Sequence, residues 1–91
     1  MIGAIMAKEI AIIQIAERKL KKRGIKKEWI NDTVINPSQV VYGYGGRKVA
    51  HKKFLISEKE YLLRVVYEES EIMYTIVTAY LTSQISRYWK E

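Results

Sequence analysis

The sequence has no cysteine, a single histidine and a single proline among its 91 residues. The lack of cysteine excludes disulfides, thiolate zinc sites, iron–sulfur clusters and cysteine nucleophiles, and a lone histidine excludes a histidine-rich metal site. The longest stretch without a charged residue, residues 72–86, has 15 residues, which is shorter than the roughly 20 that a membrane helix needs. We therefore expect no metal, no cofactor and no membrane association.

The size of the chain predicts one domain spanning residues 1–91, because chains below about 100 residues rarely divide. Its hydrophobic content of 48% is too high for a disordered protein. No secretory leader is expected, since Lys8 and Glu9 interrupt the early apolar run. These features predict a soluble, cytoplasmic, single-domain protein.

The whole chain has a net charge of +6. The positive charge is concentrated in its first part. Residues 1–53 contain 12 lysines and arginines against 4 aspartates and glutamates, a balance of +8. Residues 54–91 contain 4 against 6, a balance of −2. Net basicity favours polyanionic partners and carries no information about the fold.

Two helices are predicted in the basic part of the chain. Apolar spacing predicts a helix within residues 7–23, while a cluster of isoleucines leaves a short strand over residues 8–13 open. Gly24 is expected to end this helix, because glycine readily adopts the positive φ of a helix C-terminus. A second helix is expected over residues 27–35, before Asn36 and Pro37.

After Pro37 the pattern becomes typical of strands, over residues 40–44, 47–56, 61–68 and 72–80. Their short polar connectors favour antiparallel hairpins. A terminal helix with Ser83 as its N-cap is predicted by residues at helical spacing: Leu81, Ile85, Tyr88 and Trp89. The expected fold class is α+β, with two N-terminal helices on a three- to four-stranded antiparallel sheet and a short C-terminal helix.

A basic cluster at the junction of the two predicted helices is the first candidate binding surface. Its seven members are Arg18, Lys19, Lys21, Lys22, Arg23, Lys26 and Lys27. Grouped cations of this kind bind phosphates without reading bases. A solvated helix face explains the same pattern equally well.

An arginine within the apolar third strand is the second candidate. A connector over residues 57–60 places Ile56 opposite Tyr61 and Lys53 opposite Arg64, and side-chain alternation then puts these cations on one face with His51 and Glu68. The apolar residues of these strands share the other face: Phe54, Ile56, Leu63, Val65 and Tyr67. An arginine in this setting requires an anion, which is either Glu68 or an external phosphate.

If this face acts on RNA, cleavage uses the neighbouring 2′-hydroxyl as nucleophile and needs no metal. Arg64 and Lys53 are then the candidates that stabilise charge on the phosphorane. His51 or a tyrosine, Tyr80 or Tyr88, is the candidate general acid or base. The structural alternative for His51 is an ordinary surface histidine.

The glycine-rich segment near residue 45 is interpreted as a turn, because it lacks the phosphate-binding fingerprints and precedes a strand. Tyr42 and Tyr44 lie beside Arg47 and Lys48. These tyrosines either stack on nucleic-acid bases or cap the edge of the sheet.

Short motifs over residues 15–90 together resemble a small prokaryotic family of unknown function, which is itself similar to the RelE/ParE toxin superfamily. The motifs are Arg23-Gly24-Ile25, Asn36-Pro37, Gly45-Gly46-Arg47-Lys48, Leu62-Leu63-Arg64-Val65-Val66-Tyr67-Glu68, Thr78-Ala79-Tyr80-Leu81-Thr82-Ser83 and Arg87-Tyr88-Trp89. The resemblance implies two helices packed on an antiparallel sheet. It also implies a toxin of a toxin–antitoxin system, whose RelE-like members are metal-independent, ribosome-dependent mRNA endonucleases.

The resemblance adds Arg87 and Tyr88 to the nucleic-acid-binding candidates, and it matches Arg64 and Tyr80 to functional positions. Ile15 stands where the family usually has histidine, so an enzyme and a catalytically inert binding module both remain open. The partners it implies are an antitoxin protein and RNA or the ribosome. A homodimer is a further alternative.

Overall fold

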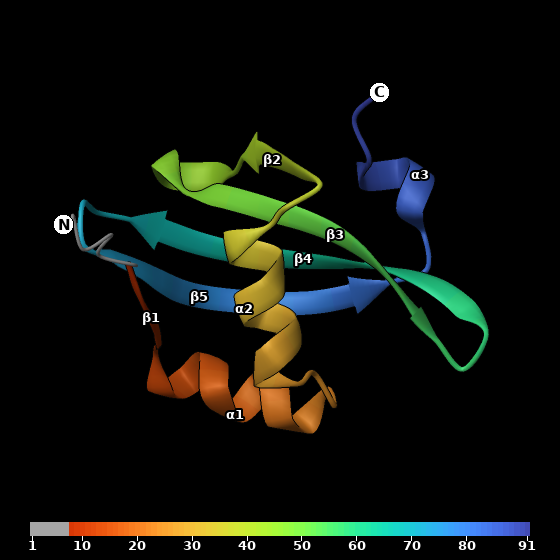
Figure 1. Ribbon diagram of the computed structural model, residues 1–91, viewed down its shortest axis with the longest axis horizontal. Coiled ribbons are helices and arrows are strands. Elements are labelled where there is room, and N and C mark those ends of the chain that lie inside the picture. Colours follow the sequence, from red (N-terminus) through yellow and green to blue (C-terminus); the bar gives the residue numbers. More distant parts are fainter. Residues whose placement is uncertain (1–7) are drawn as a thin grey trace, which may run out of the picture.

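The computed structural model describes residues 8–91. The elements in chain order are β1 (Glu9–Ile12), α1 (Gln14–Lys22), α2 (Lys27–Ile35), β2 (Gln39–Tyr42), the 3₁₀ turn η1 (Tyr44–Gly46), β3 (Lys48–Ile56), β4 (Lys59–Glu69), β5 (Met73–Thr82) and α3 (Ile85–Tyr88). The strands form a five-stranded sheet in the order β1-β5-β4-β3-β2 (Figure 1). The fold is therefore α+β, as the sequence predicts.

The sheet differs from the expected one at its β1 edge. β1 pairs with β5 in parallel, and the other strand pairs are antiparallel. The prediction of a purely antiparallel sheet of three or four strands is wrong for this reason. Of the two alternatives for residues 8–13, the strand is the correct one, because Ile10 and Ile12 pack against the core from β1.

The first helix is shorter than the periodicity predicts and ends where predicted. α1 begins at Gln14, and Gly24 follows it with φ +69°. The backbone N–H of Gly24 donates to Lys21 O, and that of Ile25 donates to Leu20 O at 3.0 Å. This is a Schellman cap, in which Ile25 and Leu20 are both buried.

The second helix has the predicted bounds. Its N-cap residue, Lys26, makes no side-chain capping hydrogen bond, so the helix is held mainly by its apolar side. Ile30 and Val34 are buried in the core, and the Trp29 ring packs on Phe54 with centroids 5.7 Å apart.

The β3–β4 hairpin closes through a two-residue turn. Ile56 pairs with Lys59, and Ser57 and Glu58 between them have φ of 49° and 66°. The predicted four-residue connector is therefore wrong, and the register moves by two residues, which places His51 rather than Lys53 opposite Arg64. A shift of two residues keeps every side chain on its predicted face.

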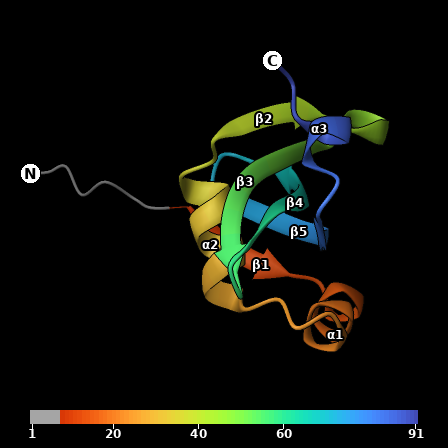
Figure 2. The same ribbon diagram turned by 90° about the vertical axis from the view of Figure 1, so that its right-hand side faces the viewer.

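The two faces of the sheet are covered differently. We call the face packed against α1 and α2 the inner face. It holds the core residues Leu20, Ile25, Ile30, Val34, Ala50, Leu63, Val65, Tyr67, Ile76 and Ala79. The opposite, outer face carries His51, Arg64 and Tyr80 and is partly covered by α3, which lies across β3 from α2 (Figure 2).

The terminal helix is shorter than predicted. Leu81 belongs to β5, and the N-cap of α3 is Gln84 rather than Ser83, without a side-chain capping bond. Leu81 packs against the core from the strand, and this burial explains why the segment continues β5. The strand predicted over residues 40–44 also differs from the structure, because β2 ends at Tyr42 and Tyr44 lies in η1.

Candidate functional site

Three side chains from neighbouring strands meet on the outer face. His51, Arg64 and Tyr80 are cross-strand partners on β3, β4 and β5, so their side chains project side by side. The Arg64 Nε–H donates to His51 Nε2 at 3.0 Å, and Arg64 Nη1 donates to the Tyr80 hydroxyl. The structure therefore brings together three of the four predicted catalytic residues.

The contact with Arg64 fixes the protonation of His51. A guanidinium can only donate, so His51 Nε2 must be the acceptor and its Nδ1 must carry the proton. That Nδ1–H donates to Gln39 Oε1 at 2.8 Å. His51 is fully buried, and this burial, followed by the positive charges of Arg64 and Lys90, lowers its pKa to about 4.

Gln39 extends this network to the end of the chain. Its Nε2 donates to Lys90 O at 2.9 Å, and the Lys90 backbone N–H donates to Gln39 Oε1 at 3.0 Å. The edge strand β2 and the segment after α3 are thus joined through one amide side chain. Neither Gln39 nor Lys90 is signalled by any sequence motif, because their roles depend on the tertiary arrangement alone.

Aromatic rings of the terminal segment cover the site. The Arg64 guanidinium carbon lies 4.1 Å from the Tyr88 ring centroid and 5.3 Å from that of Tyr80. The Trp89 ring stacks on the His51 ring with centroids 6.5 Å apart, and Lys53 Nζ lies 4.2 Å from the centroid of the Trp89 ring. Lys53 therefore joins the site through Trp89 and not through Arg64.

Arg64 keeps an uncompensated charge. None of the ion pairs formed within residues 8–91 includes Arg64. Of the two anions considered for Arg64, Glu68 does not pair with it: Glu68 lies four residues along the strand, about 13 Å away, and pairs with Arg47 at 3.1 Å. The Nη2 group of Arg64 has no hydrogen-bond partner among the described residues, and it is not completely shielded from solvent.

A hollow adjoins this cluster on the outer face. It has a volume of about 440 Å³ and is lined by Lys53, Ile85, Ser86, Trp89 and Glu91. Arg87 lies on α3 nearby, 5.6 Å from the Tyr88 ring, and is exposed. Cations and aromatic rings therefore alternate around the site, as in surfaces that bind nucleic acid.

The basic cluster of residues 18–27 lies elsewhere, on α1 and the start of α2. Arg23 is held by the sheet, since its Nη1 donates to Ala79 O at 2.8 Å. Lys27 pairs with Glu17 at 2.9 Å, and Lys26 Nζ lies 5.5 Å from the Trp29 ring. The remaining members are exposed: Arg18, Lys19, Lys21 and Lys22.

Arg47 and Lys48 are bound by carboxylates at the end of the β3–β4 pair. Arg47 pairs with Glu68, and Lys48 pairs with Glu69 at 2.9 Å. Each of these two cations therefore has a carboxylate partner, in contrast to Arg64.

Among residues 8–91, no helix has both the length and the apolar character needed to span a membrane. Comparisons with known proteins found no match: no family model matches the chain, and no curated protein and no solved structure is significantly similar to it.

Proposed function

We propose that the protein is a toxin-type module that binds RNA, with Arg64 as its central phosphate contact. The observation that carries this proposal is the uncompensated guanidinium of Arg64, which two neutral acceptors orient on the rigid centre of the sheet. Partial burial of a cation without a counter-ion costs free energy, and a bound anion offsets that cost. An RNA phosphate supplies that anion and accepts from Nη2.

Neighbouring groups support a phosphate ligand at this place. Tyr80 accepts from Arg64 through its hydroxyl oxygen, so its own proton is available to a phosphate oxygen. Lys53 adds positive charge beside the Trp89 ring and Arg87 beside the Tyr88 ring. The Tyr88 ring lies on Arg64 and the Trp89 ring on His51 and Lys53, so these rings hold the polar groups in place beside the phosphate.

A cleavage step at this site follows the usual chemistry of metal-independent ribonucleases. The 2′-oxygen attacks the adjacent phosphorus while its proton passes to a base. The bond from phosphorus to the 5′-oxygen breaks as that oxygen takes a proton from an acid, which leaves a 2′,3′-cyclic phosphate and a free 5′-hydroxyl. Arg64 neutralises the charge that develops on the phosphorane. Because the His51 Nε2 lone pair already accepts from Arg64, Tyr80 and Tyr88 are the better candidates for proton transfer, and His51 acts by positioning Arg64.

A second candidate function is a catalytically inert binding module with the same fold. The observation in its favour is the cover that Tyr88 and Trp89 place over Arg64 and His51. A covered site accommodates a phosphate at its rim more readily than a scissile bond at its centre. The two candidates share phosphate binding and differ only in whether RNA is cut.

Expression in a bacterial host tests the proposal. Wild type is expected to arrest growth with cleavage of mRNA, whereas Arg64→Ala is expected to do neither. Lys59→Ala removes one exposed positive charge at the distant β3–β4 turn and is the matched control, expected to behave as wild type. Arg64→Lys retains the charge but replaces the planar donor fork with a single ammonium group, so it is expected to be impaired although folded.

The outcomes separate the candidates. Arrest and cleavage that persist in a folded Arg64→Ala variant would remove Arg64 from the proposed function. RNA binding without arrest or cleavage by the wild type selects the inert module.

A further inference from the structure

A second pocket lies on the inner face, where the sheet extends beyond α2. It has a volume of about 450 Å³, within the range of small-ligand sites. Its lining residues are Val34, Ile35, Pro37, Val40, Tyr42, Lys48, Tyr67, Glu69 and Tyr74. Arg64 projects from the opposite face of β4, so this pocket is separate from the site described above.

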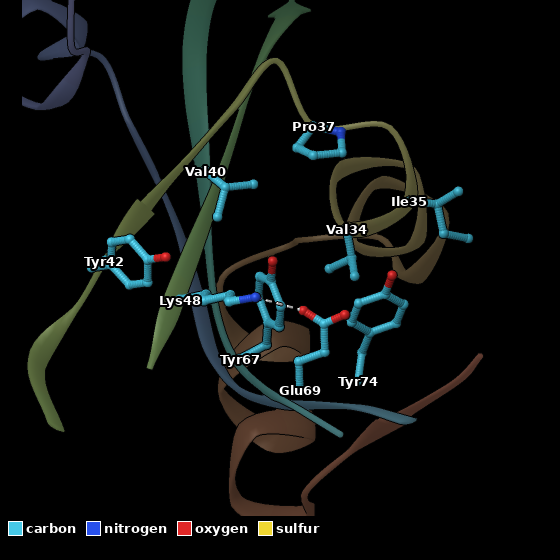
Figure 3. A pocket seen from close by; sticks show the side chains of 9 residues that line it. All are labelled: Val34, Ile35, Pro37, Val40, Tyr42, Lys48, Tyr67, Glu69 and Tyr74. Atoms are coloured by element: carbon cyan, nitrogen blue, oxygen red, sulfur yellow. Dashed lines mark hydrogen bonds and ion pairs between the residues drawn. The ribbon is translucent and has the colours of Figure 1, made fainter. Parts of the chain in front are cut away.

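The side walls of the pocket are aromatic. Figure 3 shows Tyr42 on β2 and Tyr74 on β5 at opposite sides of the pocket, with Lys48 and Glu69 between them. Tyr67 meets the Tyr74 ring edge-on, with centroids 5.6 Å apart. Tyr42 is 85% exposed, so one face of its ring is free to receive a flat ligand.

One wall of the pocket is apolar and comes from the end of α2, the connection that follows it and β2. It consists of Val34, Ile35, Pro37 and Val40. Ile35 is 58% exposed and Val40 is 44% exposed, so a ligand seated between this wall and Tyr42 covers apolar surface that the fold leaves in water.

The polar end of the pocket is formed by Glu69. Its carboxylate accepts from Lys48 Nζ at 2.9 Å and from Lys8 Nζ, and these hydrogen bonds lower its pKa. Glu69 is therefore ionised at neutral pH and retains acceptor capacity, because a carboxylate offers about four lone-pair sites. Burial raises the pKa of Tyr67, so its hydroxyl stays protonated.

We propose that this pocket binds a guanine base presented by single-stranded RNA, an inference that rests on the proposed RNA-binding function for the class of ligand. The base stacks on Tyr42 against the apolar wall. Its N1–H and N2–H₂ groups donate to the Glu69 carboxylate. Adenine and uracil each present only one such donor group on that edge, so guanine is favoured.

The local charge favours this ligand over the other occupants of such a groove. Two lysines, Lys8 and Lys48, face one carboxylate at the polar end, and the whole chain has a net charge of +6. A second copy of the chain brings its own positive charge to the same place. An acidic peptide brings carboxylates towards Glu69, whereas a nucleotide brings phosphate near the lysines and N–H donors to the carboxylate.

Nucleotide titrations followed by amide chemical shifts in NMR test the pocket directly. Guanosine 5′-monophosphate is expected to saturate the wild type with shifts centred on Val40, Tyr42 and Lys48, and to bind more tightly than the adenosine and uridine monophosphates. Tyr42→Ala is expected to weaken that binding about tenfold, because stacking on one aromatic ring contributes about 1–3 kcal/mol per base. Tyr44→Ala removes a tyrosine that is 97% exposed and outside the pocket, and it is expected to leave binding unchanged.

Glu69→Gln tests the base preference. The amide removes the ionised acceptor, so the preference for guanosine over adenosine monophosphate is expected to disappear. Equal binding in Tyr42→Ala, or a preference that survives Glu69→Gln, overturns the proposal. A dimer that dissociates on Tyr42→Ala also overturns it, since the pocket then holds a second copy.

Short RNA strands that differ in one guanine distinguish the source of the base and separate the two sites. A strand with guanine is expected to bind more tightly than the same strand with adenine, and only while Tyr42 is present. If Arg64→Ala weakens RNA binding but guanine and Tyr42 make no difference, the pocket proposal fails and the proposed function stands. If guanosine monophosphate binds at Tyr42 but RNA does not bind at Arg64, the proposed function fails, and the assignment of the base to RNA fails with it.

Discussion

His51 and Arg64 form a pair in which the histidine is the acceptor. The arrangement requires a neutral imidazole, because a protonated ring would direct a second N–H at the guanidinium. Burial and the nearby charges of Arg64 and Lys90 keep it neutral by lowering its pKa to about 4. His51 therefore supports the site by holding Arg64 in place.

The lowered pKa predicts how stability depends on pH. His51 has its ordinary pKa of 6.5 in the unfolded state, so the unfolded state binds the proton more tightly than the folded state does. The contribution of His51 to stability is therefore fully present above pH 6.5 and is lost as the pH falls to about 4. Between pH 7 and pH 5 we expect urea unfolding to show a loss of about 1 to 2 kcal/mol. The carboxylates with lowered pKa values, those of Glu17, Asp32 and Glu69, change charge below this window.

The single histidine of the chain makes the control direct. The imidazole resonances of the folded protein are expected to show no titration between pH 7 and pH 5, and His51→Gln is expected to have a flatter stability profile in that window. An imidazole that titrates near pH 6.5 in the folded protein contradicts the buried, neutral state.

Residue patterns predicted the face that carries the site but not its contacts. His51, Lys53 and Arg64 share the outer face as expected, because alternation along a strand survives a register error of two residues. The pairing of Arg64 with His51 and Tyr80 depends on the true register, and the contact with Tyr88 depends on where α3 lies. Gln39 was missed because its amide acts only through the fold.

At the level of elements, α2 was predictable because its inner apolar residues and the Asn36-Pro37 stop agree on the same bounds. The cap of α1 was predictable because Gly24 marks it. The β3–β4 turn was not, since Ser57 and Glu58 both adopt positive φ, which is typical of Asn-Gly turns rather than of these residues. The parallel pairing of β1 was not predictable either, because it joins segments more than 60 residues apart.

The turn itself offers a prediction about stability. Replacing Ser57→Asn together with Glu58→Gly supplies residues that adopt positive φ at lower cost, so the free energy of unfolding is expected to rise by about 0.5–1 kcal/mol. Chemical denaturation measures this change. The converse substitution, Glu58→Val, is expected to lower stability because a β-branched residue is strained at φ 66°. Equal stability of all three proteins contradicts the two-residue turn.

For the whole molecule, the uneven charge of the sequence divides into two surfaces. The exposed members of the basic cluster, Arg18, Lys19, Lys21 and Lys22, lie on α1 beside the inner face, whereas Arg64 lies on the outer face. The segment from β4 onward contributes the carboxylates that pair with Arg47 and Lys48. Net charge alone therefore does not locate the binding site. We place that site at Arg64, which has no carboxylate partner among residues 8–91.

The salt dependence of RNA binding, measured for wild type, Arg64→Ala and Lys59→Ala, tests that central claim most directly. Wild-type affinity is expected to fall linearly with the logarithm of the salt concentration as bound phosphates release counterions. Arg64→Ala is expected to weaken binding about tenfold and to reduce the slope by about 0.7, the value of one phosphate contact on a single strand, while Lys59→Ala changes neither. A folded Arg64→Ala variant with the affinity and slope of wild type would contradict the account.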